Sequence, residues 1–413
     1  MGQTTARGTI ESNAVPRLMV ATMPASASAH LDLIRAVAAG AVMWGHVRAL
    51  FFVDFGHIQH HGALSRLIYL LTGFGHQAVV VFFVLSGFLI SSTILRAQAS
   101  GTWSWSEYAL ARAVRLYIVL IPGLLLGFLW DMAGSSLFAS SGLYSHPLDG
   151  IDSAIVANRL TLRIFGGNLL FLQNIECQTF GSNGPLWSLA NEFWYYVLFP
   201  ICLTAGLAWY ANVRFKAITF TLAALALAVF LGPALLTGFI IWMAGCVLMI
   251  AHSTLRFSSK RWQPFYLSGC AVALCGCLLA TRTGSLSGSV GDIAVAIAFT
   301  FFLFGVLHVD VSRNIRSYLR LARRIAGFSY SLYVLHFPLL LFFRGLVSPS
   351  QRWQPDVPHL LAGWTIGALA IGFAWLISSV TEARTQQVRT WLRAALVGLR
   401  NRRTDRIVEA VGI

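Results

Sequence analysis

The stretch LDLIRAVAAGAVMWGHVRALFF, residues 31–52, is the first long apolar run of the chain. It is long enough to cross a bilayer, because about 20 apolar residues at 1.5 Å each span a hydrocarbon core of about 30 Å. The run nevertheless contains four ionisable side chains, those of Asp32, Arg35, His46 and Arg48. A charge inside a membrane helix costs roughly 2.5–3.5 kcal/mol on insertion scales, so these residues indicate a functional site.

Arg35 and His46 are eleven residues apart in this run. At 3.6 residues per turn they share one helical face, separated by about 16 Å along the axis. The helix therefore offers a fixed cation near one membrane surface and an imidazole far inside. Asp32 precedes Arg35 by three residues, so it can pair with the guanidinium and limit the cost of burying it.

The composition of the whole chain predicts an all-α polytopic membrane protein. Of its 413 residues, 57% are hydrophobic and only 11% are charged, whereas about 25% of the residues of a soluble domain are charged. We expect ten crossings, at residues 31–53, 77–95, 116–135, 186–210, 217–234, 235–251, 263–281, 291–309, 327–347 and 359–380.

The net charge of +15 follows the positive-inside rule in one orientation. With the N-terminus inside, 22 of the 30 Lys and Arg residues fall in internal segments and six in external ones, which predicts cytoplasmic termini. Nucleic-acid binding is not needed to explain the charge. We expect a cytoplasmic tail over residues 1–30, a membrane domain over 31–380, and a basic tail over 381–413 that lies on the anionic leaflet.

The cysteines and the histidine-rich loop do not predict a disulfide framework or a metal site. Five of the six cysteines fall in predicted membrane helices, where cysteine behaves as a small apolar residue, and Cys177 is alone in an external segment. The run HIQHH, residues 57–61, has no carboxylate or thiolate at ligand spacing. We expect this polar loop to touch an acceptor instead.

Two further groups of polar residues allow two interpretations each. Arg112 and Arg115 share one helical face at the predicted cytoplasmic boundary, either as membrane anchors or as a clamp for a phosphate or carboxylate. Glu192 lies about 9 Å inside a helix that begins near Leu186. His46 lies at a similar depth, which permits a contact, whereas the neighbouring Trp187, Trp194, Tyr195 and Tyr196 are typical of interfacial anchoring.

The segment FSYSLYVLHFPLLLFF, residues 328–343, brings Tyr333 and His336 within three residues. His336 is either a hydrogen-bonded packing residue or part of a site, and Pro338 would free a backbone carbonyl for such side chains.

Two other segments carry structural signals. Gly87 indicates a close contact between helices. The apolar piece NLLFLQN, residues 168–174, is too short to span and is expected to be re-entrant or interfacial.

Five blocks, in the same order, resemble the acyltransferase 3 family of bacterial membrane O-acyltransferases. They are LDLIRAVAAGAVMWGH (31–46), FFVLSGFLI (82–90), RAVRLY (112–117), GPLWSLANEFWYYVLFP (184–200) and FSYSLYVLHFPL (328–339). The resemblance implies ten helices, cytoplasmic termini and residence in the bacterial cytoplasmic (inner) membrane. It also implies transfer of an acyl group, commonly acetyl, from cytoplasmic acyl-coenzyme A to a glycan hydroxyl at the far side.

Two departures from the family pattern affect these expectations. The usual RLYP reads RLYI, with the proline delayed to Pro122, which bears on the phase of the helix that carries Arg112 and Arg115. Many members also carry an extracytoplasmic SGNH-type domain, and we expect a stand-alone form without it after Val380. The acyl group would then pass directly to the acceptor or through a separate relay protein.

The residues suggest roles in acyl transfer. We expect His46 to act as general base, contributing typically 10²–10⁴-fold, with Glu192 orienting it or positioning the acceptor. Arg35, helped by Arg112 and Arg115, would hold the coenzyme A phosphates, and no metal is needed. Candidate acceptor or oxyanion contacts are Trp187, Ser188, Tyr333 and His336; a covalent relay through Ser86 or Ser188 is the weaker variant.

The alternative function is a proton-coupled transporter or flippase of a glycolipid or small polar molecule, because buried Arg, His and Glu also mark such pathways. Against it, no pair of interrupted helices recurs in two halves of the chain. A purely structural scaffold would leave Arg35 and His46 unexplained on one face. The acceptor, the acyl chain length and the oligomeric state stay open.

Overall fold

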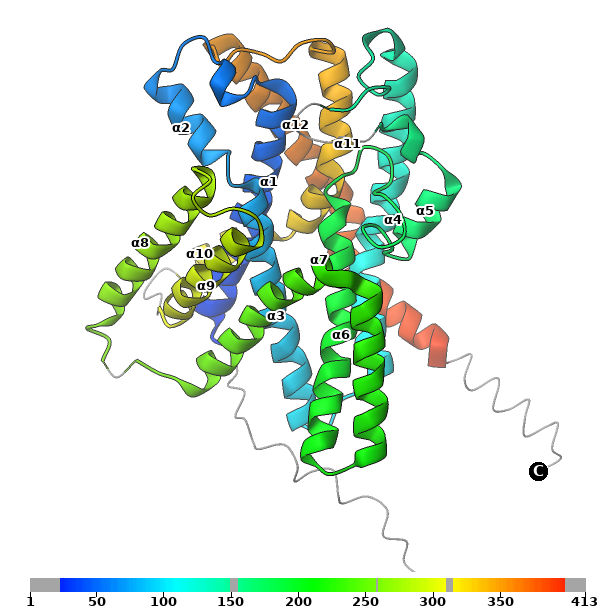
Figure 1. The fold of residues 1–413 in the computed structure, drawn as a ribbon, viewed down its shortest axis with the longest axis vertical. Coiled ribbons are helices and arrows are strands. Elements are labelled where there is room, and N and C mark those ends of the chain that lie inside the picture. Colours follow the sequence, from blue (N-terminus) through cyan, green and yellow to red (C-terminus); the bar gives the residue numbers. More distant parts are fainter. Residues whose placement is uncertain (1–22, 149–154, 258, 310–314, 398–413) are drawn as a thin grey trace, which may run out of the picture.

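The structure is a computed structural model that describes residues 23–148, 155–257, 259–309 and 315–397. Within these ranges the chain is helical and forms no β-strand (Figure 1). The helices are α1 (Ala25–Phe51), α2 (Ala63–Leu71), α3 (Gly75–Ala99), α4 (Trp105–Leu137), α5 (Leu162–Leu169), α6 (Leu186–Tyr210), α7 (Arg214–Thr254), α8 (Gln263–Arg282), α9 (Gly288–Leu307), α10 (Ile315–Ala326), α11 (Ser329–Val347) and α12 (Val357–Val380).

Nine helical stretches of the described chain are long and apolar enough to cross a membrane, which confirms the all-α polytopic fold. The expected crossings 217–234 and 235–251 lie together in the 41-residue helix α7. Gly232 interrupts this helix at φ 73°, directly before Pro233. Glycine tolerates that left-handed backbone and proline donates no N–H, so α7 consists of two helices joined by a kink, close to where the two expected crossings meet. Figure 1 shows its first part beside α6 and its second part turning away.

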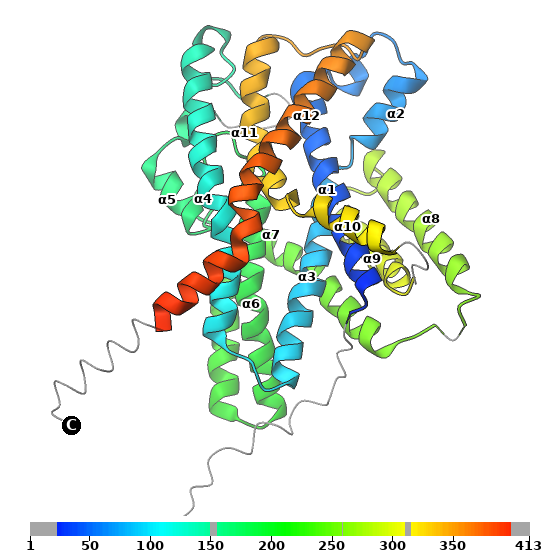
Figure 2. The ribbon, with the colours of Figure 1, turned by 180° about the vertical axis from the view of Figure 1, so that it is seen from behind.

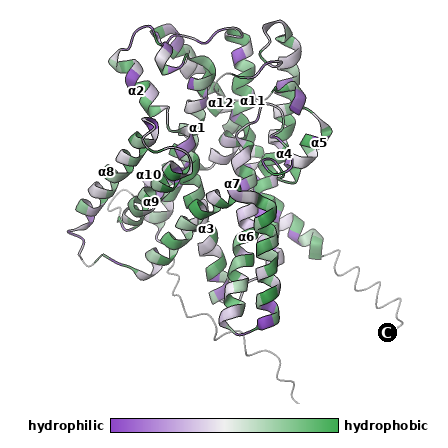
Figure 3. Ribbon diagram, in the orientation of Figure 1, coloured by the Kyte–Doolittle hydropathy of each residue, from purple (hydrophilic) through white to green (hydrophobic). Residues whose placement is uncertain are grey.

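The connections fall at two ends of the molecule. In Figure 1 those between α3 and α4 and between α6 and α7 lie at the lower end, whereas those between α1 and α2 and between α11 and α12 lie at the top. Figure 2 shows the same from behind. Figure 3 shows hydrophobic residues along the helices between these ends. Helix α1 begins at Ala25, six residues before the expected position 31.

The expected tails lie partly outside the described residues, which exclude 1–22 and 398–413. The described part of the C-terminal segment continues as a short turn of helix at Glu382–Arg384 and a helix over 385–397. Arg389 and Arg393 of this helix form ion pairs with Glu107 at the start of α4, at 3.6 and 2.9 Å. This segment therefore packs against the bundle as well as following α12.

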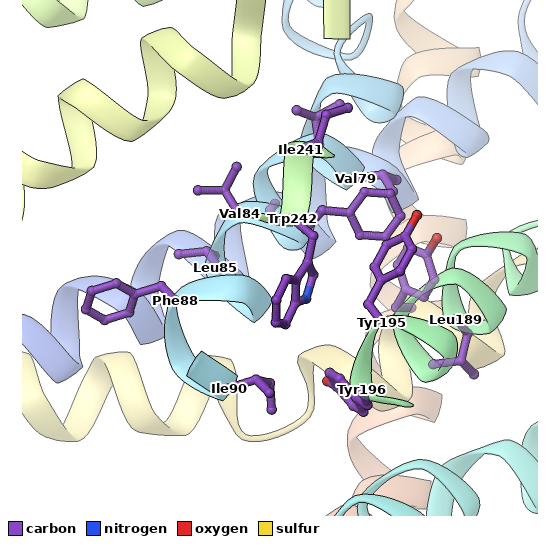
Figure 4. Close-up of a cluster of buried hydrophobic side chains, with 14 of the residues drawn as sticks. Val79, Val84, Leu85, Phe88, Ile90, Leu189, Tyr195, Tyr196, Ile241 and Trp242 are labelled. Carbon is purple, nitrogen blue, oxygen red and sulfur yellow. The ribbon is translucent and has the colours of Figure 1, made fainter. Parts of the chain in front are cut away.

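The core between α3, α6 and α7 surrounds Trp242, whose side chain is fully buried (Figure 4). Helices α3 and α7 meet at two glycines. A Cβ atom at Gly87 would overlap the carbonyl oxygen of Trp242, and one at Gly245 would overlap the carbonyl oxygen of Val84. The interpretation of Gly87 as a close-packing residue is thus confirmed, because backbone meets backbone at this crossing.

Helix α11 is buried among α1, α4 and α12. Pro338 cannot donate to the carbonyl of Val334 four residues earlier, and that carbonyl instead accepts a hydrogen bond from Asn183 Nδ2 at 2.9 Å. The partner of the freed carbonyl is therefore a residue of the loop before α6 and not the histidine of α11. This bond fixes the start of α6 against α11, which positions the residues described next.

We predict that Gly87→Ala lowers the stability of the protein, because the added methyl group must separate α3 from the backbone of α7. Overpacking of this kind typically costs about 1–3 kcal/mol. Thermal unfolding of the detergent-purified protein measures the change. Gly206→Ala in α6 is the control, because a Cβ there meets nothing within 4 Å; equal melting temperatures for both variants would contradict the packing argument.

Candidate functional site

Two cavities meet at Tyr333, which lines both of them. The arginine cavity, of about 600 Å³, is lined by Arg35, Arg112, Arg115, Arg323 and Arg389 together with Asp32, Glu192 and Glu382. The histidine cavity, of about 670 Å³, is lined by His46, Arg48, His76, Arg159 and Trp187 with the amides of Asn174 and Gln178. Both volumes are in the range of small-molecule sites. The structure thus separates Arg35 and His46, which share α1, into neighbouring cavities.

His46 and His336 form a hydrogen-bonded pair between α1 and α11. His46 Nδ1 lies 2.7 Å from His336 Nε2, and His336 Nδ1 lies 2.9 Å from the carbonyl oxygen of Leu332. A carbonyl only accepts, so His336 Nδ1 carries the proton and its Nε2 accepts when the ring is neutral. His46 must then donate from Nδ1, which leaves its Nε2 with a free lone pair.

This arrangement gives the two histidines different abilities. Both ring nitrogens of the buried His336 are engaged, so it is not free to donate to an oxyanion or to touch an acceptor as we expected. It instead fixes the tautomer and orientation of His46. His46, which lines the histidine cavity, keeps one basic nitrogen that can accept a proton there.

The arginine cavity combines paired and unpaired cations. Arg35 Nη1 lies 3.4 Å from Asp32 Oδ1, which confirms the expected pairing, and Arg115 Nη1 lies 3.0 Å from Glu382 Oε1. The guanidinium of Arg112 stacks near two tyrosine rings, and its buried Nε has no hydrogen-bond partner among the described residues. Arg112 and Arg115 both line the cavity, so the displaced proline leaves them on one face.

Glu192 lies in the arginine cavity and has partners other than His46. Its Oε1 accepts hydrogen bonds from Ser86 Oγ at 2.8 Å and from the hydroxyl of Tyr196. Trp242 Nε1 in turn donates to Ser86 Oγ at 3.2 Å. Equal depth along two helices did not produce a contact, and the residue that orients His46 is His336.

Tyr333, which lines both cavities, contacts Ser188, which lines the arginine cavity. Their hydroxyl oxygens are 2.5 Å apart, and both lie near the carbonyl oxygen of Pro185, at 3.0 Å from Tyr333 and 3.4 Å from Ser188. Among the described residues neither Ser188 nor Ser86 forms a hydrogen bond with a histidine, and a partner of Ser86 is the Glu192 carboxylate. Trp187 lines the histidine cavity, where its ring stacks on that of His76 with 6.3 Å between the ring centres, and His76 pairs with Asp292 at 2.9 Å.

The piece 168–174 folds back without crossing the molecule. Phe171 and Asn174 adopt positive φ values of 56° and 68°, which reverse the chain after α5. Asn168 is fully buried and holds the turn through Nδ2 donating to the carbonyl of Gln178 at 2.9 Å and Oδ1 accepting from the amide of Phe180 at 3.1 Å. The turn thereby supplies amide side chains to the histidine cavity.

Several site residues were missed by the sequence reasoning. Glu382 was assigned to a surface tail, yet its side chain is buried and bridges Arg115 to the amide and hydroxyl of Ser331, each at 3.1 Å. Arg323 and Arg389 were counted only as positive-inside charges. A carboxylate among arginines just after a predicted last span was the available signal. In the described part of the chain, no three His, Cys, Asp or Glu side chains gather as a metal site.

Comparison with known proteins assigns a family to this geometry. A family model described as an acyltransferase domain, that of the acyltransferase 3 family, matches residues 28–379. No curated protein and no solved structure matches the chain. The match covers the lining of the histidine cavity and most of that of the arginine cavity, whose lining residues from Glu382 to Arg389 lie beyond it.

We predict that Glu382→Ala destabilises the protein, because it leaves Arg115 and the Ser331 amide without their acceptor. Breaking a buried ion pair costs 3–5 kcal/mol; because Arg115 is 31% exposed, we expect about 1–3 kcal/mol. The melting temperature in detergent measures the loss. Glu107→Ala removes a more exposed carboxylate from two arginines and should change stability by less than about 1 kcal/mol. A larger loss in Glu107→Ala would refute the assignment.

Proposed function

This chain belongs to the acyltransferase 3 family, so it is a membrane acyltransferase, and from that premise we propose its substrates and mechanism. The donor is acyl-coenzyme A, commonly acetyl-coenzyme A, bound at the arginine cavity from the cytoplasm of a bacterium. The acceptor is a hydroxyl of a glycan, extracytoplasmic or lipid-linked, bound at the histidine cavity. Both termini are cytoplasmic and the protein lies in the inner membrane.

The single observation that carries this proposal is the directed hydrogen-bond chain from the Leu332 carbonyl through His336 to His46. It leaves His46, a lining residue of the histidine cavity, with one basic ring nitrogen, and Tyr333 lines both this cavity and the arginine cavity. A transporter needs no such fixed tautomer. Family membership also favours the acyltransferase over the transporter that the sequence left open.

The arginine cavity supports a phosphate-bearing donor. Two of its guanidinium groups, those of Arg112 and Arg323, have no carboxylate partner among the described residues. The buried Nε of Arg112 is an unused donor, and arginine binds phosphate oxygens with its planar fork. Arg35 and Arg115, already paired with carboxylates, would complete the positive surface. The pantetheine arm would then run past Tyr333 towards His46.

In the proposed reaction His46 Nε2 takes the proton of the acceptor hydroxyl, whose oxygen attacks the thioester carbonyl carbon. Collapse of the tetrahedral intermediate breaks the C–S bond and forms the ester, and the coenzyme A thiolate takes the proton back from His46. His336 holds the imidazole and stabilises it when charged. No covalent enzyme intermediate is required, although a separate relay protein could present the final acceptor.

We predict that His46→Ala abolishes transmembrane acyl transfer. Inverted membrane vesicles are supplied with radiolabelled acetyl-coenzyme A, and label on a lumenal glycan or lipid-linked product is measured. The wild type should label the product, and the variant should be slower by 10²–10⁴-fold, the usual contribution of a general base. Equal labelling would remove His46 from the mechanism. Absence of label in both the wild type and the variant would contradict acetyl-coenzyme A as the donor and would favour the transporter function.

We predict that His336 acts through His46. The catalytic rate should then depend on whether residue 336 offers a hydrogen-bond acceptor to His46, more than on whether residue 336 can carry a charge. His336→Gln retains an oxygen that can accept from His46 Nδ1, whereas His336→Leu does not. The glutamine variant should therefore keep a kcat at least about tenfold above that of the leucine variant, with the KM for acetyl-coenzyme A unchanged in both. Equal kcat values would show that His336 only packs.

We predict that Arg112→Gln raises the KM for acetyl-coenzyme A by about tenfold or more while kcat changes little, since a charge-assisted hydrogen bond contributes roughly 1.5–3 kcal/mol. Arg214→Gln, at the start of α7 and outside both cavities, is the matched control on the same predicted side. A change in kcat alone would place Arg112 outside the donor site.

A further inference from the structure

We propose that the acceptor carries an anionic group, a carboxylate or a phosphate, and that Arg48 binds it in the histidine cavity. The proposal rests on the proposed function in one respect, that this cavity is the acceptor side. It adds the charge class of the substrate and a specificity residue. Arg48 has no part in the chemistry described above.

The lining of the histidine cavity is positively charged. It contains Arg48, Arg159, His46 and His76, with hydroxyls and amides from the segment 159–184 and from Thr72, and its described lining residues include no Asp or Glu. The arginine cavity, by contrast, has three carboxylates among its lining residues. A neutral sugar would need only the amides and hydroxyls, so the cations indicate an additional, charged feature of the ligand.

Arg48 is the cation of this cavity whose charge is least compensated. Its guanidinium lies 5.3 Å from the centre of the Tyr69 ring, and the Tyr69 hydroxyl is held by the carbonyl of Val53 at 2.6 Å. Among the described residues, the buried Nε atom of Arg48 has no hydrogen-bond partner and its guanidinium forms no ion pair with a carboxylate. The Arg48 side chain is therefore held against the Tyr69 ring, and its guanidinium has N–H donors available for a ligand.

The carboxylates nearest to this region have other partners. Asp54 receives two hydrogen bonds from Arg352, at 3.2 and 2.8 Å, although its charge also acts on Arg48. Asp292 is paired with His76 at 2.9 Å. Arg282 also lies close enough to repel Arg48. The carboxylates of this region are thus paired with other cations, and Arg48 is available to bind a ligand.

A half-buried cation that forms no ion pair is costly, and a bound anion would offset that cost. Arg48 follows His46 by two residues on α1 and lines the same cavity. An anionic group held by Arg48 would therefore fix the acceptor close to the base. A carboxylate and a phosphate both suit the planar fork of arginine, so the two are distinguished by experiment.

The test uses three sugars that differ only at carbon 6: methyl glucoside, methyl glucuronide and methyl glucoside 6-phosphate. Their dissociation constants are measured by ligand-observed NMR on the full chain in nanodiscs. We expect at least one anionic sugar to bind about tenfold or more tightly than the glucoside, as a charge-assisted contact would give. Tighter binding of the glucuronide would identify a carboxylate as the anionic group, and tighter binding of the 6-phosphate would identify a phosphate.

Variants connect the preference to Arg48. Arg48→Gln should bind all three sugars equally, and Arg48→Lys should keep part of the preference. Arg66→Gln, an exposed arginine of α2 that lines neither cavity, should keep all of it. Three results would overturn the proposal: no binding of any anionic sugar, equal binding of charged and neutral sugars by the wild type, or a preference that survives in Arg48→Gln.

Acetyl-coenzyme A binding separates this proposal from the proposed function. Arg48→Gln should bind acetyl-coenzyme A as the wild type does, which also shows that the variant is folded. Loss of that binding in both Arg48 variants would assign Arg48 to the donor and overturn the proposal. A wild type that prefers the anionic sugars through Arg48 but neither binds acetyl-coenzyme A nor acetylates them would overturn the proposed donor and leave the anion site standing.

Discussion

The hydrogen bond between His46 and His336 is the contact on which the rest of the site depends. It joins α1 to α11, and its direction is set by a single backbone carbonyl, that of Leu332. An imidazole alone in an apolar helix has no preferred tautomer. A second imidazole that is itself committed to a carbonyl gives the first one a defined donor side and a defined basic side. The polarity of this histidine pair therefore comes from a backbone carbonyl of α11 rather than from a buried carboxylate.

Buried charge is distributed unevenly around this centre. On one side of Tyr333, carboxylates compensate part of the arginine charge, as Glu382 does for Arg115. On the other side the described lining of the cavity has cations and no carboxylate. Charge buried without compensation is unfavourable unless a ligand supplies the opposite sign. The two cavities thus differ in what they require of a ligand, although they share Tyr333 as a lining residue.

Sequence reasoning predicted the fold class, the family, the Asp32–Arg35 pair and the close packing at Gly87, because these depend on composition, spacing and residue size within one or two helices. It did not predict the partner of His46. Glu192 and His336 were both polar residues at plausible depth, and depth along a helix does not fix rotation about its axis. The position of Glu382 was missed for a related reason. Counting spans stops at the last apolar segment, but side chains that follow this segment can still point into the helix bundle.

The same long-range pairing has a consequence for how the protein is made. His46 and His336 are separated by 290 residues, and His30 of α1 likewise contacts Tyr318 of α10, 288 residues later. Helix α1 leaves the ribosome first, so it must enter the bilayer while Arg48 and His46 still lack the helices that will surround them. Local pairing within α1, such as that of Asp32 with Arg35, is then the only compensation that the chain itself can provide. During synthesis there is therefore an interval in which α1 has left the ribosome but the His46–His336 and His30–Tyr318 contacts cannot yet form.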